Sequence, residues 1–239
     1  MLLDELLTYL FDGQPHILAE PMESWLRSSR RFTVFVTSFR DKIRKKLRVT
    51  REQETLYDLQ LELETAYLLL QERTLSVVYE PERAGPGRSP DFAVTYTTSL
   101  RFMVEVTRLR ALAPSDPSPE QEGERLADAI CSKLRQFLPQ RPNVLIVGIG
   151  ALELTQSDLQ SIMLRIQQRA ERSNSTFWQR YGFRERADFF QGYQRLSEIL
   201  VHPSLRQTTK PAVVWVNPQA RHPLPSKVRT ALHRSHNAN

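Results

Sequence analysis

Hydrophobic residues recur along the chain in two patterns, one typical of helices and one typical of strands. Three segments repeat apolar residues every three or four positions and are predicted to be amphipathic helices: residues 51–73, 119–138 and 156–172. Five shorter runs, rich in β-branched and aromatic residues, are predicted to be strands: residues 75–79, 91–97, 100–107, 143–149 and 212–216. Because helices and strands are interleaved, the pattern predicts an α/β fold.

The remaining segments are less regular. Residues 1–12 predict a short helix, and a further helix is predicted over residues 186–201. Residues 31–39 fit either a strand or the start of a basic helix that continues to Val49, and the pattern does not separate these alternatives. The expected organisation is a helical, basic extension packed on the core (residues 1–50), an α/β domain (residues 51–217) and a basic, partly disordered tail (residues 218–239).

Two carboxylates stand where the pattern otherwise indicates buried strand. Asp91 opens a predicted strand directly after Pro90, and Glu105 lies inside the apolar run from Phe102 to Val106. A buried carboxylate is costly unless a partner compensates its charge. Two such acids on paired strands favour a shared divalent metal ion, although a turn at Asp91 or a salt bridge from Glu105 to an arginine would also explain them.

The helix predicted over residues 51–73 carries a third acid of interest. Its start fits a capping box formed by Thr50 and Gln53. The apolar stripe along this helix places Glu62 beside the buried face, whereas Glu64 is expected to point to the opposite side, towards solvent.

Composition narrows the class of protein. The chain has 239 residues, of which 40% are hydrophobic and 25% charged, and this is typical of a globular protein. No apolar run reaches the roughly 20 residues that cross a bilayer, and the first residues carry acids where a signal peptide carries basic residues. A cytoplasmic protein without membrane contact is therefore expected. The single cysteine, Cys131, excludes an intramolecular disulfide and a multi-cysteine zinc site.

Basic charge is concentrated locally. Between Arg27 and Arg48 there are nine lysines and arginines against one acid, Asp41. Such a cluster favours contact with a phosphate backbone, although a solvated basic helix face has the same composition. The residues expected to bind nucleic acid are Arg40, Lys42, Arg44, Lys45, Lys46 and Arg48.

The order of elements and the positions of the acids resemble the PD-(D/E)XK nuclease-like superfamily. The matching residues are Glu62 on the helix, Ser89-Pro90-Asp91 at the start of the second strand, and Glu105-Val106-Thr107 in the third. The resemblance covers about residues 51–150. It implies a restriction-endonuclease-like αβββαβ core, with a mixed central sheet flanked by helices and extra helices at both ends. It also implies a Mg²⁺ or Mn²⁺ ion held by Asp91, Glu105 and Glu62.

One residue departs from the family pattern. The family places a lysine two residues after the strand acid, and here that position is Thr107, whose hydroxyl can orient a water but carries no charge. Some members move a functional residue to a neighbouring element. By that resemblance Lys133, at the apolar edge of the following helix, is the expected replacement, and Gln136 is expected to bond the lysine or a ligand. Arg108 should point to the other side of the strand from Thr107.

These observations leave three functional hypotheses. The first is a Mg²⁺-dependent nuclease acting on DNA. The second is a nuclease fold with a lapsed active site that binds nucleic acid or serves as a partner subunit, and Thr107 favours it. The third is an interaction protein whose acids form salt bridges with arginines. The sequence leaves open whether the protein forms a homodimer.

Overall fold

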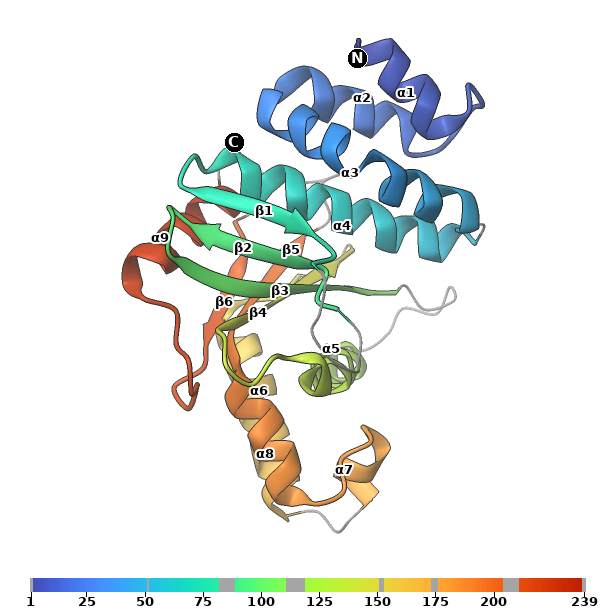
Figure 1. Cartoon of the computed structure of the whole chain (residues 1–239). Helices are drawn as coiled ribbons and strands as arrows, with labels where there is room; N and C mark the ends of the chain where they lie inside the picture. The colour runs from blue at the N-terminus through green and yellow to red at the C-terminus, as the bar shows by residue number, and fades with distance from the viewer. Residues whose placement is uncertain are drawn as a thin grey trace.

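One mixed sheet of six strands forms the centre of the molecule (Figure 1). The computed structural model describes residues 2–50, 52–81, 89–110, 119–150, 153–172, 176–203 and 211–237. The strands are β1 (Leu75–Tyr79), β2 (Phe92–Tyr96), β3 (Leu100–Leu109), β4 (Asn143–Ile149), β5 (Leu196–Pro203) and β6 (Val213–Val216). They lie in the sheet in chain order, and the β3–β4 and β4–β5 pairs are parallel while the other pairs are antiparallel. The expected α/β class, with a mixed sheet flanked by helices, is confirmed.

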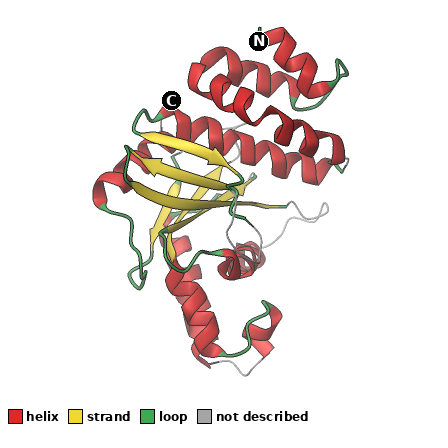
Figure 2. Cartoon of the chain, viewed as in Figure 1, coloured by secondary structure: helices red, strands yellow, loops and turns green. Residues whose placement is uncertain are grey.

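Helices cover both faces of this sheet (Figure 2). They are α1 (Leu3–Phe11), α2 (Ala19–Ser28), α3 (Arg30–Val49), α4 (Gln53–Gln71), α5 (Pro119–Lys133), α6 (Gln156–Arg172), α7 (Thr176–Arg180), α8 (Arg186–Arg195) and α9 (Ser226–Asn237), and a 3₁₀ turn, η1 (Leu134–Gln136), follows α5. Helices α1 to α4 and α9 contribute to the core on one face, whereas α5, α6 and α8 contribute to the core on the other. None of the helices in the described part of the chain is long and apolar enough to span a bilayer.

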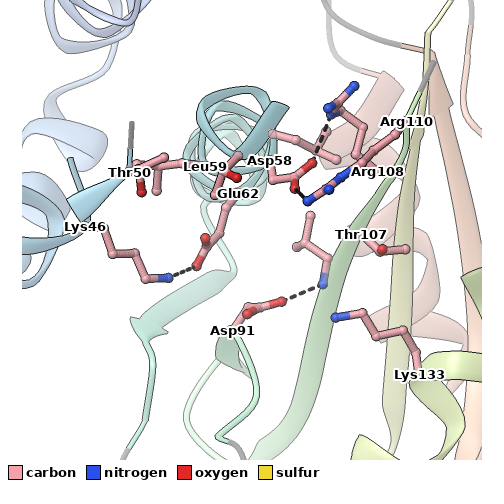
Figure 3. Close-up of a pocket in the computed structure, with 13 residues that line it drawn as sticks. Lys46, Thr50, Asp58, Leu59, Glu62, Asp91, Thr107, Arg108, Arg110 and Lys133 are labelled. Atoms are coloured by element: carbon pink, nitrogen blue, oxygen red, sulfur yellow. Dashed lines mark hydrogen bonds and ion pairs between the residues drawn. The ribbon is translucent and has the colours of Figure 1, made fainter. Parts of the chain in front are cut away.

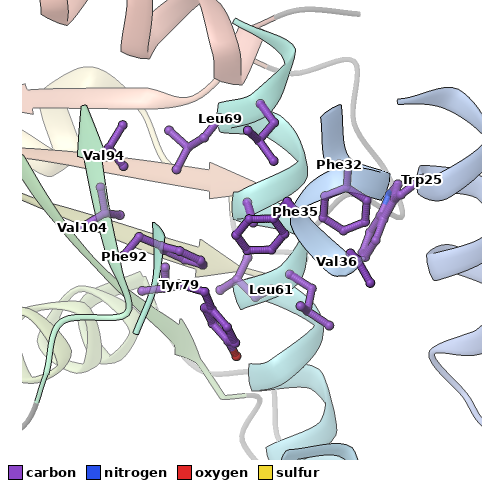
Figure 4. Close-up of a cluster of buried hydrophobic side chains, with 14 of the residues drawn as sticks. Trp25, Phe32, Phe35, Val36, Leu61, Leu69, Tyr79, Phe92, Val94 and Val104 are labelled. Atoms are coloured by element: carbon purple, nitrogen blue, oxygen red, sulfur yellow. The ribbon is translucent and has the colours of Figure 1, made fainter. Parts of the chain in front are cut away.

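Alternation along the strands divides the core between these two faces. In β4, Val144 and Ile146 belong to the cluster on the α4 face, while Leu145 and Val147 belong to the cluster on the α5 face. Figure 4 shows the α4-face cluster, where side chains of the N-terminal helices meet those of α4 and the strands. Its members include Trp25, Phe32, Phe35, Leu61, Leu69, Tyr79, Phe92 and Val104. Residues 2–50 therefore share their core with the sheet.

The structure decides between the alternatives for residues 31–39 in favour of a helix. They lie in α3, which starts where the Ser29 side chain accepts a hydrogen bond from the Phe32 N–H. The helix is interrupted at Phe39, whose backbone is not helical. Burial of Phe32, Phe35 and Val36 against α4 and the strands outweighs the weak helix propensity of this β-branched and aromatic run.

Two expectations for α4 are wrong. Thr50 does not cap this helix, because the residue before its first turn is Glu52 and no side chain there accepts a capping hydrogen bond. Glu64 does not face solvent, since only 3% of its surface is exposed. The helix contacts the sheet, α3 and α9, so little of its circumference remains open to solvent. A single apolar stripe therefore understates how much of α4 is buried.

The helix expected over residues 186–201 is only half correct. Helix α8 ends at Arg195, and β5 begins at the next residue. Within β5, both Ser197 and Glu198 are buried beside their apolar neighbours. A strand buried on both faces loses the alternation that distinguishes it from a helix, so the pattern could not separate the two.

The C-terminal segment docks more fully than its composition suggested. Residues 226–237 form α9, and Leu224, Val228 and Leu232 are buried in the α4-face core. The free energy gained by burying these side chains explains why a segment without acids is nevertheless ordered.

Helix α4 approaches the end of β4 closely at Gly148. A Cβ atom added there would lie 2.5 Å from a methyl carbon of Leu61, whereas one at Gly150 would meet no described atom within 4 Å. Gly148→Ala should therefore lower the free energy of unfolding by about 1–3 kcal/mol through overpacking. Gly150→Ala is the matched control and should change it little. Urea denaturation measures both, and equal stabilities of the two variants would contradict the close approach.

Acid should destabilise the protein through His236 on α9. Its ring is buried beside His202, and burial lowers the pKa of His236 from 6.5 to about 3. At pH values between these two pKa values, His236 is protonated in the unfolded chain but neutral in the folded protein. The free energy of unfolding should thus fall by about 1.4 kcal/mol per unit of pH as the pH drops below 6.5. Urea denaturation at pH 5 and pH 7 measures this slope, which His236→Gln should reduce and His222→Gln should leave intact.

Candidate active site

A cleft of about 430 Å³ opens where α3, α4, β2, β3 and α5 meet (Figure 3). It lies beside the start of β2 and the final residues of β3, so its walls come from segments far apart in the sequence. The residues expected to be functional that line it are Lys46, Glu62, Asp91, Thr107 and Lys133. The fold therefore brings four of the six predicted catalytic residues to one cleft, together with Lys46 of the basic set.

Asp91 is fixed between the second and third strands. Its Oδ2 accepts a hydrogen bond from the Val106 N–H at 2.8 Å, and its carbonyl accepts one from the Glu80 N–H at 2.8 Å. Val106 lies beyond the last β2–β3 pair, Phe92 with Val104, so the carboxylate replaces the missing strand partner. This bond offsets part of the cost of burying Asp91, which is 7% exposed.

Glu105 and Lys133 meet on the α5 face of the sheet. Val104 and Val106 belong to the core on the α4 face, so alternation directs Glu105 to the opposite face, where α5 lies. Lys133 Nζ lies 3.4 Å from Glu105 Oε2 and 3.4 Å from Gln136 Oε1. The Glu105 carboxylate is 2% exposed and does not line the cleft itself, whereas Lys133 does. The lysine thus connects the buried acid to the cleft.

Thr107 lines the cleft two residues beyond Glu105 on the same side of β3. Arg108 points the other way, as expected, and bonds two acids of α4: its Nε lies 3.0 Å from Asp58, and it also pairs with Glu54. Arg110 joins the same group at 2.7 Å from Asp58. Sequence reasoning missed Asp58 and Arg110 as cleft residues, because their pairing links segments about fifty positions apart.

Glu62 faces the cleft from α4 and is held by Lys46 of α3. Lys46 Nζ lies 2.6 Å from Glu62 Oε1 and 2.7 Å from Glu80 Oε1. Burial, reinforced by the negative charge of Asp91, raises the pKa of Glu62 to about 6, and Lys46 opposes this rise. Burial lowers the pKa of Lys46, but Glu62 and Glu80 outweigh it, so the pKa is raised overall. Glu62 and Asp91 are therefore close enough to repel one another.

The basic residues of α3 divide into separate groups. Arg44 and Arg48 pair with Asp12 at the end of α1, and hydrogen bonds from Arg48 and Arg44 hold the pKa of Asp12 at about 2. Lys45 is exposed and makes no ion pair with a described residue. The others contact nearby groups: Arg40 approaches Asp41, Lys42 donates to the Glu80 carbonyl, and Lys46 enters the cleft. Nucleic-acid binding by this set stays a prediction.

The oxygen donors of the cleft suit a hard divalent cation. Asp91 and Glu62 repel one another, and a cation between them would relieve that repulsion. Within the described residues, no group of three or more His, Cys, Asp or Glu side chains converges to hold a metal ion. Of the three carboxylates that line the cleft, Asp58 is paired with Arg108 and Arg110, so Asp91 and Glu62 are the donors that the geometry offers. Glu105 lies behind Lys133.

No protein-family model matches the chain. Neither the curated proteins nor the solved structures contain a match.

The arrangement combines acidic oxygens, a lysine and a threonine hydroxyl at one end of a sheet. Asp91 and Glu62 can bind a cation, Lys133 can place a positive charge beside an anionic reactant, and Thr107 can orient a water. Groups of these kinds can support metal-assisted hydrolysis of a phosphate ester.

Proposed function

We propose that the protein is a metal-dependent nuclease of the PD-(D/E)XK type that hydrolyses phosphodiester bonds in DNA. The observation that carries this proposal is the position of Lys133. Its ammonium lies 3.4 Å from Glu105 and lines the same cleft as Asp91, Glu62 and Thr107. A lysine displaced from β3 to α5 would in this way supply the charge that Thr107 lacks.

Asp91 and Glu62, with Glu105 as the family resemblance implies, would hold a Mg²⁺ or Mn²⁺ ion. When bound, such an ion lowers the pKa of a water and offsets negative charge on phosphate oxygens. Asp91 is suited to this task because its hydrogen bond from Val106 fixes the carboxylate in place.

The chain's own residues would then orient and stabilise the reactants. Lys133 would stabilise negative charge that develops on the phosphate, since the cleft is partly screened from water and the lysine side chain is only 13% exposed. Gln136 and Glu105 hold the lysine side chain on either side. The Thr107 hydroxyl would form a hydrogen bond with the attacking water, either as donor or as acceptor.

The test is a cleavage assay with the full chain. Supercoiled plasmid and end-labelled single- and double-stranded DNA and RNA should be incubated with Mg²⁺, with Mn²⁺ and with EDTA. We expect cleavage of DNA that requires a divalent ion. Intact substrates under every metal condition would overturn the proposal.

The second candidate is a nuclease-like fold without activity that binds nucleic acid or a partner subunit. Two observations favour it: Thr107 in place of the motif lysine, and the salt bridge that occupies Glu62. Under this alternative, DNA should bind without being cleaved, and calorimetry should detect no Mn²⁺ binding that depends on Asp91 and Glu105.

A further inference from the structure

We propose that Lys46 is an internal counter-cation of the cleft, and that a divalent ion must displace its ammonium from Glu62 in order to bind. This inference rests on the proposed metal site, which it deepens by naming a residue of the N-terminal helices that controls it. Lys46 would then set the affinity of the cleft for metal.

The first support is the geometry of the ammonium group. Lys46 Nζ bridges Glu62 Oε1 at 2.6 Å and Glu80 Oε1 at 2.7 Å, and it lies 4.8 Å from the centre of the Tyr79 ring. These contacts exceed those of a typical surface lysine, which makes one mobile ion pair. A cation that binds Glu62 must compete with Lys46 for the same carboxylate.

The second support is the environment of the pair. The side chains of Lys46 and Glu62 are only 27% and 13% exposed, so solvent screens their attraction weakly. Asp91 adds a second negative charge to the same cleft. Lys46 directly contacts two carboxylates, those of Glu62 and Glu80, while Asp91 acts on Glu62, so a divalent ion would balance the negative charge around Glu62 more fully.

The third support is where Lys46 comes from. It is the only residue of α3 that lines the cleft within the described part of the chain, while the rest of the cleft wall comes from the 50–133 region. Helix α3 packs against α1 and α2, so the position of Lys46 depends on the N-terminal helices. Displacement of the Lys46 ammonium by a metal ion would therefore link metal binding in the cleft to the position of these helices.

Neighbouring Lys45 provides a matched control. It lies on the same helix one position away, is exposed, and makes no ion pair with a described residue. Lys45→Met removes the same charge as Lys46→Met, but from a site where salt and water screen it.

Calorimetric titration of Mn²⁺ into the full chain at pH 8 tests the proposal. Lys46→Met should bind Mn²⁺ roughly tenfold more tightly than the wild type, because a nearby like charge has been removed. Lys45→Met should bind as the wild type does. In a Glu62→Gln background, Lys46→Met should no longer change the affinity, since the shared carboxylate is gone.

Thermal denaturation gives a second measurement. Without metal, Lys46→Met should melt below the wild type, because Glu62 and Glu80 lose their counter-charge. Saturating Mn²⁺ should raise its melting temperature by more than that of the wild type. A purely structural salt bridge would lower stability without increasing this response to Mn²⁺.

Unchanged or weaker Mn²⁺ binding by Lys46→Met would overturn the inference, as would the absence of Mn²⁺ binding in every variant. Tighter Mn²⁺ binding by Lys46→Met in a protein that cleaves no nucleic acid would support the inference and contradict only the proposed nuclease activity.

Discussion

Asp91→Asn should lower the rate of the proposed metal-dependent DNA cleavage by roughly a thousandfold, because one anionic ligand of the proposed cation would be lost. The fold should survive the change. The asparagine amide oxygen can still accept the hydrogen bond from the Val106 N–H that Asp91 accepts at 2.8 Å. The rate is measured under single-turnover conditions on end-labelled DNA, with circular dichroism as the check on folding.

Asp188→Asn is the matched control for this prediction. Asp188 lies on α8, where it pairs with Arg184 at 2.9 Å and does not line the cleft. Its variant should cleave at the wild-type rate. Cleavage by Asp91→Asn at the wild-type rate would instead show that Asp91 has only a structural role, that of accepting a hydrogen bond from β3.

Lys133→Met should reduce cleavage by roughly a hundredfold while leaving DNA binding nearly unchanged. It should also lower the free energy of unfolding, because the buried Glu105 carboxylate loses its counter-charge. Methionine preserves most of the aliphatic length of the side chain, so packing against the cleft wall persists. A second substitution, Thr107→Lys, should restore part of the lost rate, since Thr107 lines the same cleft and occupies the family's lysine position. Single-turnover rates of the two single variants and the double variant measure this rescue.

The outcome of the double variant decides between two explanations. Partial rescue identifies the charge itself as the missing component, supplied from β3 instead of α5. A double variant as slow as Lys133→Met would contradict the idea that Lys133 replaces the motif lysine. Lys227→Met, on the exposed side of α9, controls for the general effect of removing a lysine.

The sequence predicted a helix or strand well where the hydrophobic pattern within that element was clear. The strands Leu75–Tyr79 and Asn143–Ile149 and the helix Gln156–Arg172 have the predicted bounds. It failed for β5, because this strand follows α8 without an intervening loop and its buried Ser197 and Glu198 interrupt the apolar run that identifies a buried strand such as β4. It also failed for Glu64, because the contacts that bury it come from segments distant in sequence.

The candidate site was predictable to a similar extent. Periodicity placed Lys133 at the edge of the apolar face of its helix, and its ammonium lies 3.4 Å from Glu105 in the structure. Its role in place of the motif lysine stays a prediction. The role of Lys46 could not be predicted. Its place in a basic run suggested solvent or phosphate contact, and only the packing of α3 on α4 directs it to Glu62.

The same packing indicates how the chain must assemble during synthesis on the ribosome. The core on the α4 face combines side chains from helices α1 to α4 with Val228 and Leu232 of α9. The first four helices are thus translated long before the helix that completes their core. Until residues 226–237 leave the exit tunnel, the apolar side of α4 stays partly uncovered. We therefore expect this face to complete its folding only after residues 226–237 have emerged, whereas the antiparallel β1–β3 hairpins can pair earlier in synthesis.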